Sequence, residues 1–267
     1  MLIVRNVFIV TMALLMQMPL HAQTASLRIE QATVIADSIP DNSNQEQDVI
    51  QNKFPIKSFI IPAALITYGA ITMSSHSPNS INGKLQEQIW INKPHSTNGV
   101  DNFLMFVPAV SVYALNAFGV KGKNNFKDRT MIYLMSNIIS NVIVYPTKTF
   151  TKEIRPNGKK YSFPSGHTST AFASAEFMRM EYKDRSALYG VAGYLMAAAT
   201  GYLRMYNNKH WFSDVVTGAG IGIASTQLSY WLYPKIKKAF SKNKPSNTIV
   251  MPTYNNGTFG LSFNKQF

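Results

Sequence analysis

The sequence predicts an all-α protein, a six-helix bundle that spans a membrane or associates with one. Six apolar segments follow residue 55, and no strand-rich region precedes the C-terminus. Hydrophobic residues make up 46% of the chain and charged residues only 15%, against roughly 25% charged in an ordinary soluble domain. Small residues in runs such as AAATG and GAGIGIAS favour helices that pack closely.

The first 23 residues are predicted to be a signal peptide. Arg5 supplies a positive start, residues 7–18 are apolar, and Ala22 precedes a polar stretch, which is the pattern of an export signal. An uncleaved anchor is the alternative, and either version takes the chain out of the cytoplasm into the cell envelope. Residues 24–52 are expected to be a polar N-terminal segment, and residues 53–240 the helical domain.

The length of the apolar segments and the distribution of charge give conflicting indications of whether the helices cross a membrane. The second, third, fifth and sixth segments are nearly free of charge over a length close to that of a bilayer, but the fourth carries Glu176, Arg179 and Glu181. Basic residues gather in alternate connections, which the positive-inside rule places in the cytoplasm, whereas an exported N-terminus followed by six spans places them outside. The six segments are residues 56–73, 103–120, 131–145, 168–180, 186–205 and 211–233.

Residues 241–267 are expected to form a C-terminal tail, whose sequence pattern differs from that of the helical segments. Residues 248–254 and 258–263 alternate in polarity around Asn255-Asn256-Gly257, a turn signal that predicts a β-hairpin. Because an isolated hairpin is only marginally stable, an appendage without a role and a docking element are both retained as interpretations.

The net charge of +13, from 26 Lys and Arg against 13 Asp and Glu, indicates an anionic partner. Nucleic acid, an anionic membrane surface and a phosphorylated substrate all fit such a charge. No nucleic-acid-binding motif is present, and the basic residues lie between apolar segments, so we expect no nucleic acid. The chain contains no Cys, which excludes a disulfide, a thiolate nucleophile and a Cys-ligated metal.

Three polar clusters interrupt the apolar pattern. In an up-and-down bundle, the connection between the third and fourth helices lies at the same end as that between the fifth and sixth. We therefore expect the clusters to meet in one pocket. They are Lys148 with Arg155-Pro156, Pro164-Ser165-Gly166-His167, and Arg204 with His210 and Asp214.

The third cluster has the spacing of an activated histidine. His210 and Asp214 are four residues apart at the start of a helix, so they share one face. A carboxylate in that position accepts the Nδ1 proton of the imidazole and leaves Nε2 free to attack phosphorus. His167 is left to protonate the leaving group as a general acid.

The other polar residues of the clusters are suited to binding phosphate. Ser165 and Gly166 lead into a helix whose first amides point outward, and such a helix start binds phosphate well. Lys148, Arg155 and Arg204 add three cations for the phosphoryl oxygens. Together these residues predict phosphoryl transfer through a phosphohistidine, with no metal and no cofactor.

The clusters resemble the three-part signature of the type 2 phosphatidic acid phosphatase and vanadium haloperoxidase superfamily. That signature reads Lys, six residues, Arg-Pro; then Pro-Ser-Gly-His; then Ser-Arg, five residues, His, three residues, Asp. Leu203 stands here in place of its last Ser, a departure that puts this detail of the phosphate pocket in doubt but not the mechanism. The flanking residues SFPSGHTSTAF and RMYNNKHWFSDVVTGAGIG are similar to the bacterial membrane-associated lipid phosphatases.

The resemblance implies a role for each matching residue. His210 attacks, Asp214 orients it, and His167 protonates the leaving oxygen. The phosphate-binding residues would be Lys148, Arg155, Ser165, Gly166, His167 and Arg204.

The predicted function is a metal-independent phosphatase acting on phosphorylated membrane lipids, with its active site facing the periplasm. Phosphatidic acid, phosphatidylglycerol phosphate, lipid A phosphates and undecaprenyl pyrophosphate are all candidate substrates. The alternatives are a soluble-type periplasmic acid phosphatase for small esters, vanadate-dependent halide oxidation in the same pocket, and a non-catalytic envelope protein that keeps the scaffold.

Several of these residues also have purely structural interpretations. His167 and His210 could be satisfied core histidines, and Asp214 could cap a helix. Ser165 could act as an N-cap, a role compatible with binding phosphate. Lys148 and Arg155 could belong to a solvated charged stretch in which Lys152 substitutes for Lys148.

Overall fold

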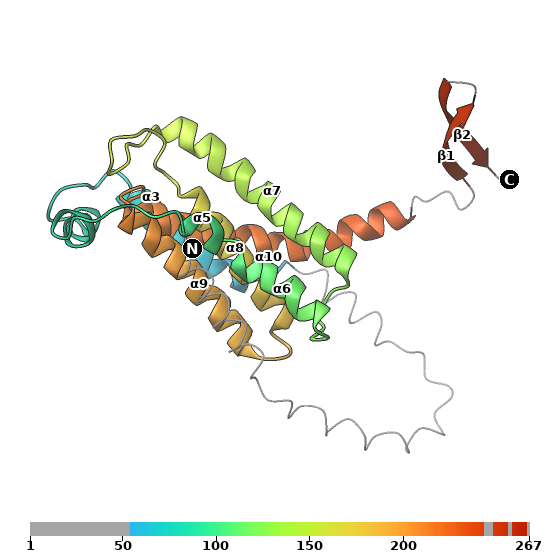
Figure 1. Ribbon diagram of the computed structural model, residues 1–267, viewed down its shortest axis with the longest axis horizontal. Helices are drawn as coiled ribbons and strands as arrows, with labels where there is room; N and C mark the ends of the chain where they lie inside the picture. Colours follow the sequence, from blue (N-terminus) through green and yellow to red (C-terminus); the bar gives the residue numbers. More distant parts are fainter. Residues whose placement is uncertain (1–53, 243–247, 256–257, 266–267) are drawn as a thin grey trace, which may run out of the picture. The chain divides into compact units, whose positions relative to one another are not determined.

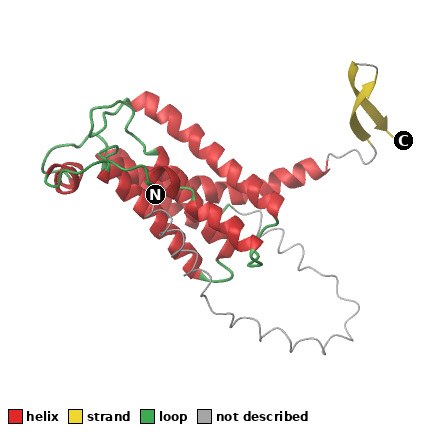
Figure 2. Ribbon diagram, in the orientation of Figure 1, coloured by secondary structure: helices red, strands yellow, loops and turns green. Residues whose placement is uncertain are grey.

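The computed structural model describes residues 54–242, 248–255 and 258–265. The predicted signal peptide and polar segment, residues 1–52, lie outside the described residues. The chain forms two compact units, one ending at Tyr230 and the other beginning at Trp231. The described part of the first unit is helical and carries the candidate site, which confirms the all-α prediction (Figures 1 and 2).

Each of the six predicted segments falls on a helix, and short helical turns that the sequence did not predict lie between the first two. The helices are η1 (Ile56–Phe59), α3 (Ile60–Thr72), α4 (Ile81–Gln86), η2 (Glu87–Ile91), α5 (Asp101–Leu104), α6 (Val107–Ala117), α7 (Phe126–Thr151), α8 (Gly166–Tyr182), α9 (Ala187–Tyr206) and α10 (Phe212–Lys242).

Helix α7 extends further in both directions than its apolar segment. It begins after Asn125, whose side chain accepts from the backbone N–H of Asp128, and it continues through Pro146 to Thr151. Asn at an N-cap satisfies one of the free amides of the first turn, so the helix begins within a polar stretch. The extension carries Lys148 on the last turn of the helix.

Helix α8 is the centre of the bundle. Eleven of its seventeen residues are buried. Its apolar half contributes Phe177, Met178 and Tyr182 to a core cluster with Val112 and Leu115 of α6. Burying a side chain of this size stabilises the fold by roughly 1.5–3 kcal/mol, so this cluster holds α6 against α8.

Glycines bring α10 into direct contact with the start of α8. A Cβ atom on Gly218 would lie 2.5 Å from the carbonyl oxygen of Ser165, and one on Gly222 would lie 2.2 Å from that of Ser169. Small residues at this spacing allow two helix backbones to approach closely. This approach sets the candidate residues at the start of α10 beside those at the start of α8.

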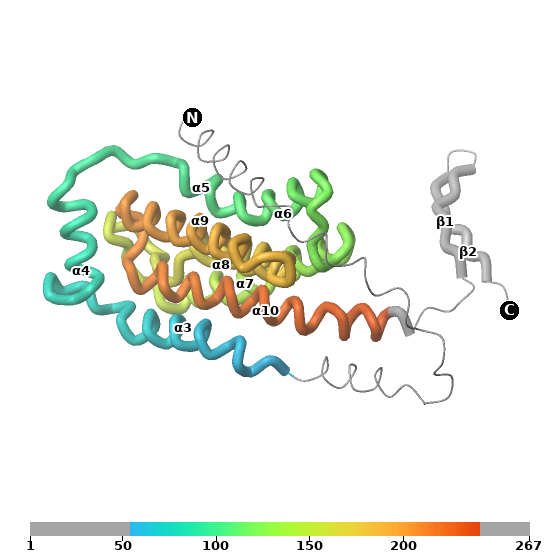
Figure 3. Tube along the Cα trace, turned by 90° about the horizontal axis from the view of Figure 1, so that it is seen from below, coloured from blue at the N-terminus to red at the C-terminus, as the bar shows by residue number. Residues whose placement is uncertain are grey.

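On its other side α10 packs against α3. A Cβ atom on Gly220 would lie 2.7 Å from the carbonyl oxygen of Pro62, and the two helices run side by side in Figure 3. Helix α4 is attached to the start of α10 by Asn82, whose Oδ1 accepts from the backbone N–H of Ser213 at 3.0 Å.

No helix within residues 54–242 combines the length and the apolarity needed to cross a bilayer. In the second unit, β1 (Thr248–Asn255) pairs antiparallel with β2 (Thr258–Lys265), with Asn255 opposite Thr258.

Candidate active site

His210 and Asp214 meet at the start of α10. His210 Nδ1 lies 3.2 Å from Asp214 Oδ2, and both residues are buried. The same carboxylate oxygen accepts from the backbone N–H of Trp211 at 2.9 Å and from the hydroxyl of Ser162. These contacts fix the carboxylate against the Nδ1 edge of the ring.

The electrostatics of this pair favour a neutral imidazole. Burial lowers the pKa of His210 well below its usual value, and the charges of Arg204, Lys148 and Arg155 lower it further. Burial raises the pKa of Asp214 to about 6, against hydrogen bonds from Ser162 and Trp211 that lower it. At neutral pH the imidazole can donate Nδ1–H to the carboxylate and keep a lone pair on Nε2.

The Pro164–His167 cluster lies beside this pair. The backbone N–H of Ser165 donates to the carbonyl oxygen of Asp214 at 3.0 Å. The Ser165 hydroxyl caps α8 by accepting from the N–H of Thr168 at 3.4 Å, so its side chain has the N-cap role considered above. A Cβ atom on Gly166 would meet only Val144, at an ordinary 3.7 Å, so packing within the protein does not require Gly there.

His167 is half-buried on the first turn of α8. Its Nε2 lies 2.9 Å from Asn102 Oδ1. Burial, and after it the charge of Arg204, lower the pKa of His167 to about 4. The ring is therefore neutral at neutral pH, unless an anion arrives to offset the neighbouring cations.

Lys148 reaches the site from the last turn of α7. Its Nζ donates to the carbonyl oxygens of Tyr161 at 2.9 Å and Ser162 at 3.1 Å. Burial, and after it the charge of Arg155, lower the pKa of Lys148 to about 8. Lys148 therefore also supports the loop that carries Ser162.

The two arginines each have a buried N–H donor that is spare. Arg155 Nε and Arg204 Nε are both buried and have no hydrogen-bond partner among the residues that the structure describes. Arg204 is 4% exposed, and its Nη1 donates to Asp101. A buried N–H without an acceptor is unfavourable, and an anion between these groups would supply the missing acceptors.

The three clusters lie within electrostatic range of one another. The charges of Arg155 and Arg204 act on both His167 and His210, and His167 also acts on His210. The structure therefore brings together all eight residues that the sequence singled out. Their catalytic and binding roles stay predictions.

Four residues of this region were missed by the sequence analysis. Lys209 and Ser162 lie next to the motifs in the sequence. Their position as polar residues in the motif loops was a signal that could have identified them. Asp101 and Asn102 lie on α5 and contact Arg204 and His167 across more than sixty residues of sequence, for which the sequence offers no signal. No group of three His, Asp or Glu residues that could hold a metal occurs within the described ranges.

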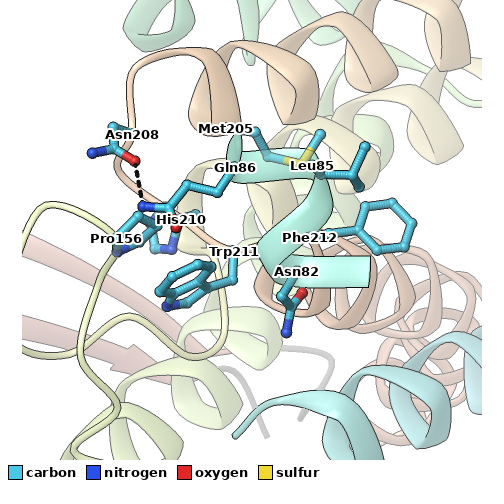
Figure 4. Close-up of a pocket in the computed structure, with 9 residues that line it drawn as sticks. All are labelled: Asn82, Leu85, Gln86, Pro156, Met205, Asn208, His210, Trp211 and Phe212. Atoms are coloured by element: carbon cyan, nitrogen blue, oxygen red, sulfur yellow. Dashed lines mark hydrogen bonds between the residues drawn. The ribbon is translucent and has the colours of Figure 1, made fainter. Parts of the chain in front are cut away.

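One side of His210 faces a small hollow (Figure 4). Its accessible volume of about 10 Å³ is close to the minimum that holds one water molecule. Gln86 Nε2 donates to Asn208 Oδ1 across it at 3.4 Å. The lining residues are Asn82, Leu85, Gln86, Pro156, Met205, Asn208, His210, Trp211 and Phe212.

Comparison with known protein families finds one match. A model of the PAP2 superfamily matches residues 129–238, a stretch that contains all three clusters. This part of the chain is therefore similar to the PAP2 superfamily. The resemblance stated from the motifs is confirmed.

Two proteins that are named as lipid phosphatases are similar to this chain in sequence. The chain is 30% identical to a lipid A 1-phosphatase of Porphyromonas gingivalis over 236 residues, which cover 85% of this chain and 51% of that protein. It is 31% identical to lipid phosphate phosphatase 2 of Arabidopsis thaliana over 110 residues, which cover 37% of this chain and 36% of that protein. The chain thus spans about half the length of the first relative and less of the second.

Two solved structures are similar. The crystal structure of LpxE from Aquifex aeolicus has a TM-score of 0.44 at 24% identity and covers 57% of this chain and 95% of its own. A transmembrane PAP2-type phosphatidylglycerolphosphate phosphatase from Bacillus subtilis has a TM-score of 0.43 at 19% identity and covers 68% of this chain and 97% of its own.

Proposed function

We propose that this protein is a metal-independent phosphatase that hydrolyses phosphomonoester or pyrophosphate groups of membrane lipids through a phosphohistidine. The observation that carries the proposal is the buried His210–Asp214 contact beside two guanidinium groups whose buried Nε atoms have no hydrogen-bond partner among the described residues. A nucleophilic histidine needs a partner that orients its ring. A phosphoryl group in transfer needs cations that stabilise its charge.

The proposed reaction has two steps. His210 Nε2 attacks phosphorus and the bond to the leaving oxygen breaks, while His167 gives that oxygen a proton and Asp214 stabilises the cationic ring of His210. Water then attacks the phosphohistidine as His167 takes its proton, the N–P bond breaks, and inorganic phosphate leaves. Lys148, Arg155 and Arg204 hold the phosphoryl oxygens in both steps.

The low pKa of His167 fits this scheme when the substrate charge is counted. Burial and nearby cations hold that pKa at about 4. A phosphate dianion offsets those cations, so its arrival raises the pKa of His167. His167 would then take up the proton that the leaving group requires only when substrate is bound.

An exposed apolar stripe on α7 supports a lipid substrate and a membrane surface. Large exposed apolar patches mark sites of membrane or protein contact. The stripe approaches the turn of α7 that carries Lys148, so a lipid tail along it would bring the headgroup to the candidate site. Its residues are Met131, Leu134, Ile138, Val142 and Tyr145.

The name of the Porphyromonas relative makes the 1-phosphate of lipid A the first substrate to test. We further propose that the protein associates with a membrane of the cell envelope and that its site faces the periplasm, because the N-terminal residues have the pattern of an export signal.

The test measures phosphate release by the detergent-purified full-length chain from lipid A, phosphatidic acid, phosphatidylglycerol phosphate, undecaprenyl pyrophosphate and p-nitrophenyl phosphate. We expect release from at least one lipid in EDTA, its loss in His210→Ala, and trapping of a labelled phosphohistidine in the native protein. His95→Gln is the matched control, because His95 packs on Tyr206 outside the proposed mechanism.

Activity that EDTA abolishes and a divalent ion restores would contradict the mechanism. Release from p-nitrophenyl phosphate alone, with every lipid untouched, would favour the soluble-type acid phosphatase instead.

A further inference from the structure

Asp101 is a buried carboxylate that faces the phosphate-binding end of the bundle. It is fully buried, and it accepts from Arg204 Nη1, from Asn207 Nδ2 at 3.3 Å and from Lys209 Nζ at 3.4 Å. A buried cation without a counter-charge is strongly unfavourable. Asp101 therefore determines where the guanidinium of Arg204 lies before any phosphate arrives.

Asn102, the next residue, contacts the other side of the site. Its Oδ1 lies 2.9 Å from His167 Nε2. Since an amide oxygen can only accept, this contact requires the proton of the neutral ring to be on Nε2. Asn102 therefore selects the tautomer of His167 and the direction in which its N–H points.

The short helix α5 that carries both residues is itself held in place. The backbone N–H of Asn98 donates to Asn207 Oδ1 at 2.9 Å, and Asn207 Nδ2 returns a hydrogen bond to the carbonyl oxygen of Asn98 at 3.0 Å. Leu104 at the end of α5 is buried. Adjacent residues of one anchored turn thus contact a proposed phosphate ligand and the proposed general acid.

We propose that Asp101 and Asn102 are positioning residues of the phosphatase reaction, Asp101 acting through Arg204 on the transferring phosphoryl group and Asn102 acting through His167 on the leaving group. This inference rests on the proposed function. When substrate binds, the leaving oxygen takes the place of Asn102 Oδ1 as the acceptor for His167 Nε2–H. The Asn102 amide then lies beside the leaving group.

The two roles are separated by the choice of leaving group. A p-nitrophenolate leaves without much help from an acid, whereas the alkoxide of a lipid or sugar needs a proton. Asn102→Leu is therefore expected to lower kcat/KM, which reports the step in which the leaving group departs, by about tenfold or more on the lipid phosphate, up to the 10²–10⁴-fold that a general acid contributes. On p-nitrophenyl phosphate it should change kcat/KM by less than about threefold, a small fraction of that contribution.

Asp101→Asn is expected to lower kcat on both esters by a similar factor, about 10²-fold, the usual effect of one misplaced oxyanion donor. Phosphate binding, followed as the rise in Tm with added inorganic phosphate, should be as tight as in the native protein or tighter, because a competing negative charge is removed. Asp101→Glu keeps the charge and should recover part of the lost kcat, which separates positioning from misfolding.

Two controls match the chemistry of these changes at exposed positions. Asp184→Asn, in the α8–α9 connection, removes the same charge, and Asn141→Leu, on α7, makes the same amide-to-alkyl change. Both should leave kcat on each ester within about twofold, as for surface substitutions generally.

Equal losses on both esters in Asn102→Leu, or phosphate binding that weakens in step with kcat in Asp101→Asn, would overturn the proposal. If the native protein releases phosphate from no ester, the proposed function fails. The phosphate-induced rise in Tm still tests Asp101 in that case, because binding requires no turnover.

Discussion

In the C-terminal half of α8 two buried carboxylates are surrounded by donors, whereas near its N-terminal end two arginines each keep a buried N–H group without an acceptor. Glu176 accepts from Arg179 Nε at 2.7 Å, from Tyr194 at 2.5 Å and from Gln227 at 3.1 Å. Among the described residues, neither Arg155 Nε nor Arg204 Nε has such a partner.

Glu181 repeats the pattern of Glu176. It accepts from the side chain of Asn124 at 2.6 Å and from Tyr230 at 2.7 Å, and Arg129 lies within 3.9 Å. Buried polar groups in folded proteins are almost always hydrogen-bonded. The difference between the two ends is that the framework charges are paired inside the protein, while the charges proposed to bind phosphate are left partly unpaired.

The largest expected effect is on turnover at the N-terminal end. Asp214→Asn should lower kcat by about 10⁴-fold, the loss seen when a histidine loses its orienting carboxylate. Stability at pH 7 should not fall. The pKa of Asp214 is raised from the ordinary aspartate value of 3.8 to about 6. The folded state therefore loses stability as pH rises between these two values, and Asn avoids that loss.

The measurement combines phosphate-release kinetics with urea unfolding of the same preparation. A fall in the free energy of unfolding that parallels the fall in kcat would show that Asp214 is a framework residue like Glu176, and the contrast between the two ends would disappear.

The second effect is on stability at the C-terminal end. Glu176→Gln leaves Arg179 without its carboxylate and should lower the free energy of unfolding by about 3 kcal/mol, with kcat per folded molecule unchanged. Urea unfolding measures it. Glu87→Gln, at an exposed position of η2, is the matched control and should change stability by less than about 0.5 kcal/mol. A loss of kcat in Glu176→Gln would show that Glu176 also affects turnover, and it would contradict the assignment of this carboxylate to the framework alone.

The third effect tests the spare donors directly. Inorganic phosphate at about 100 times its Kd should stabilise the native protein by about 2.7 kcal/mol, visible as a rise in Tm. Arg155→Gln should abolish most of this rise. Arg129→Gln, which removes a buried arginine already bonded to the carbonyl oxygen of Asn124, should lower Tm but keep the rise. Equal rises in both variants would rule out Arg155 as a phosphate ligand.

The smallest effect is on the pH profile of kcat/KM. Activity should rise with pH as Asp214 ionises near 6 and fall above about 8, where Lys148 loses its charge, with each limb changing about tenfold per pH unit. Lys148→Arg keeps its charge and should move only the basic limb upward. A basic limb that stays in place would exclude Lys148 as its origin.

The local parts of the site were predictable from the sequence because they depend on short spacings. A separation of four residues at a helix start places His210 and Asp214 on one face, and Ser165 before an apolar segment is an ordinary N-cap signal. The six apolar segments located the long helices for the same reason. Helices α4 and α5 are too short to show a helical period, and they were missed.

The order of residues along this chain determined which side chains could act on phosphate and which helices would carry them, since both follow from spacing within one or two turns. Only the tertiary structure decided that α5 lies over the site, with Asp101 on Arg204 across 103 positions and Ser162 on Asp214 across 52. Contacts over such distances result from the packing of whole helices, here the close approach of α10 to α8 through Gly218 and Gly222, and no local pattern encodes that packing.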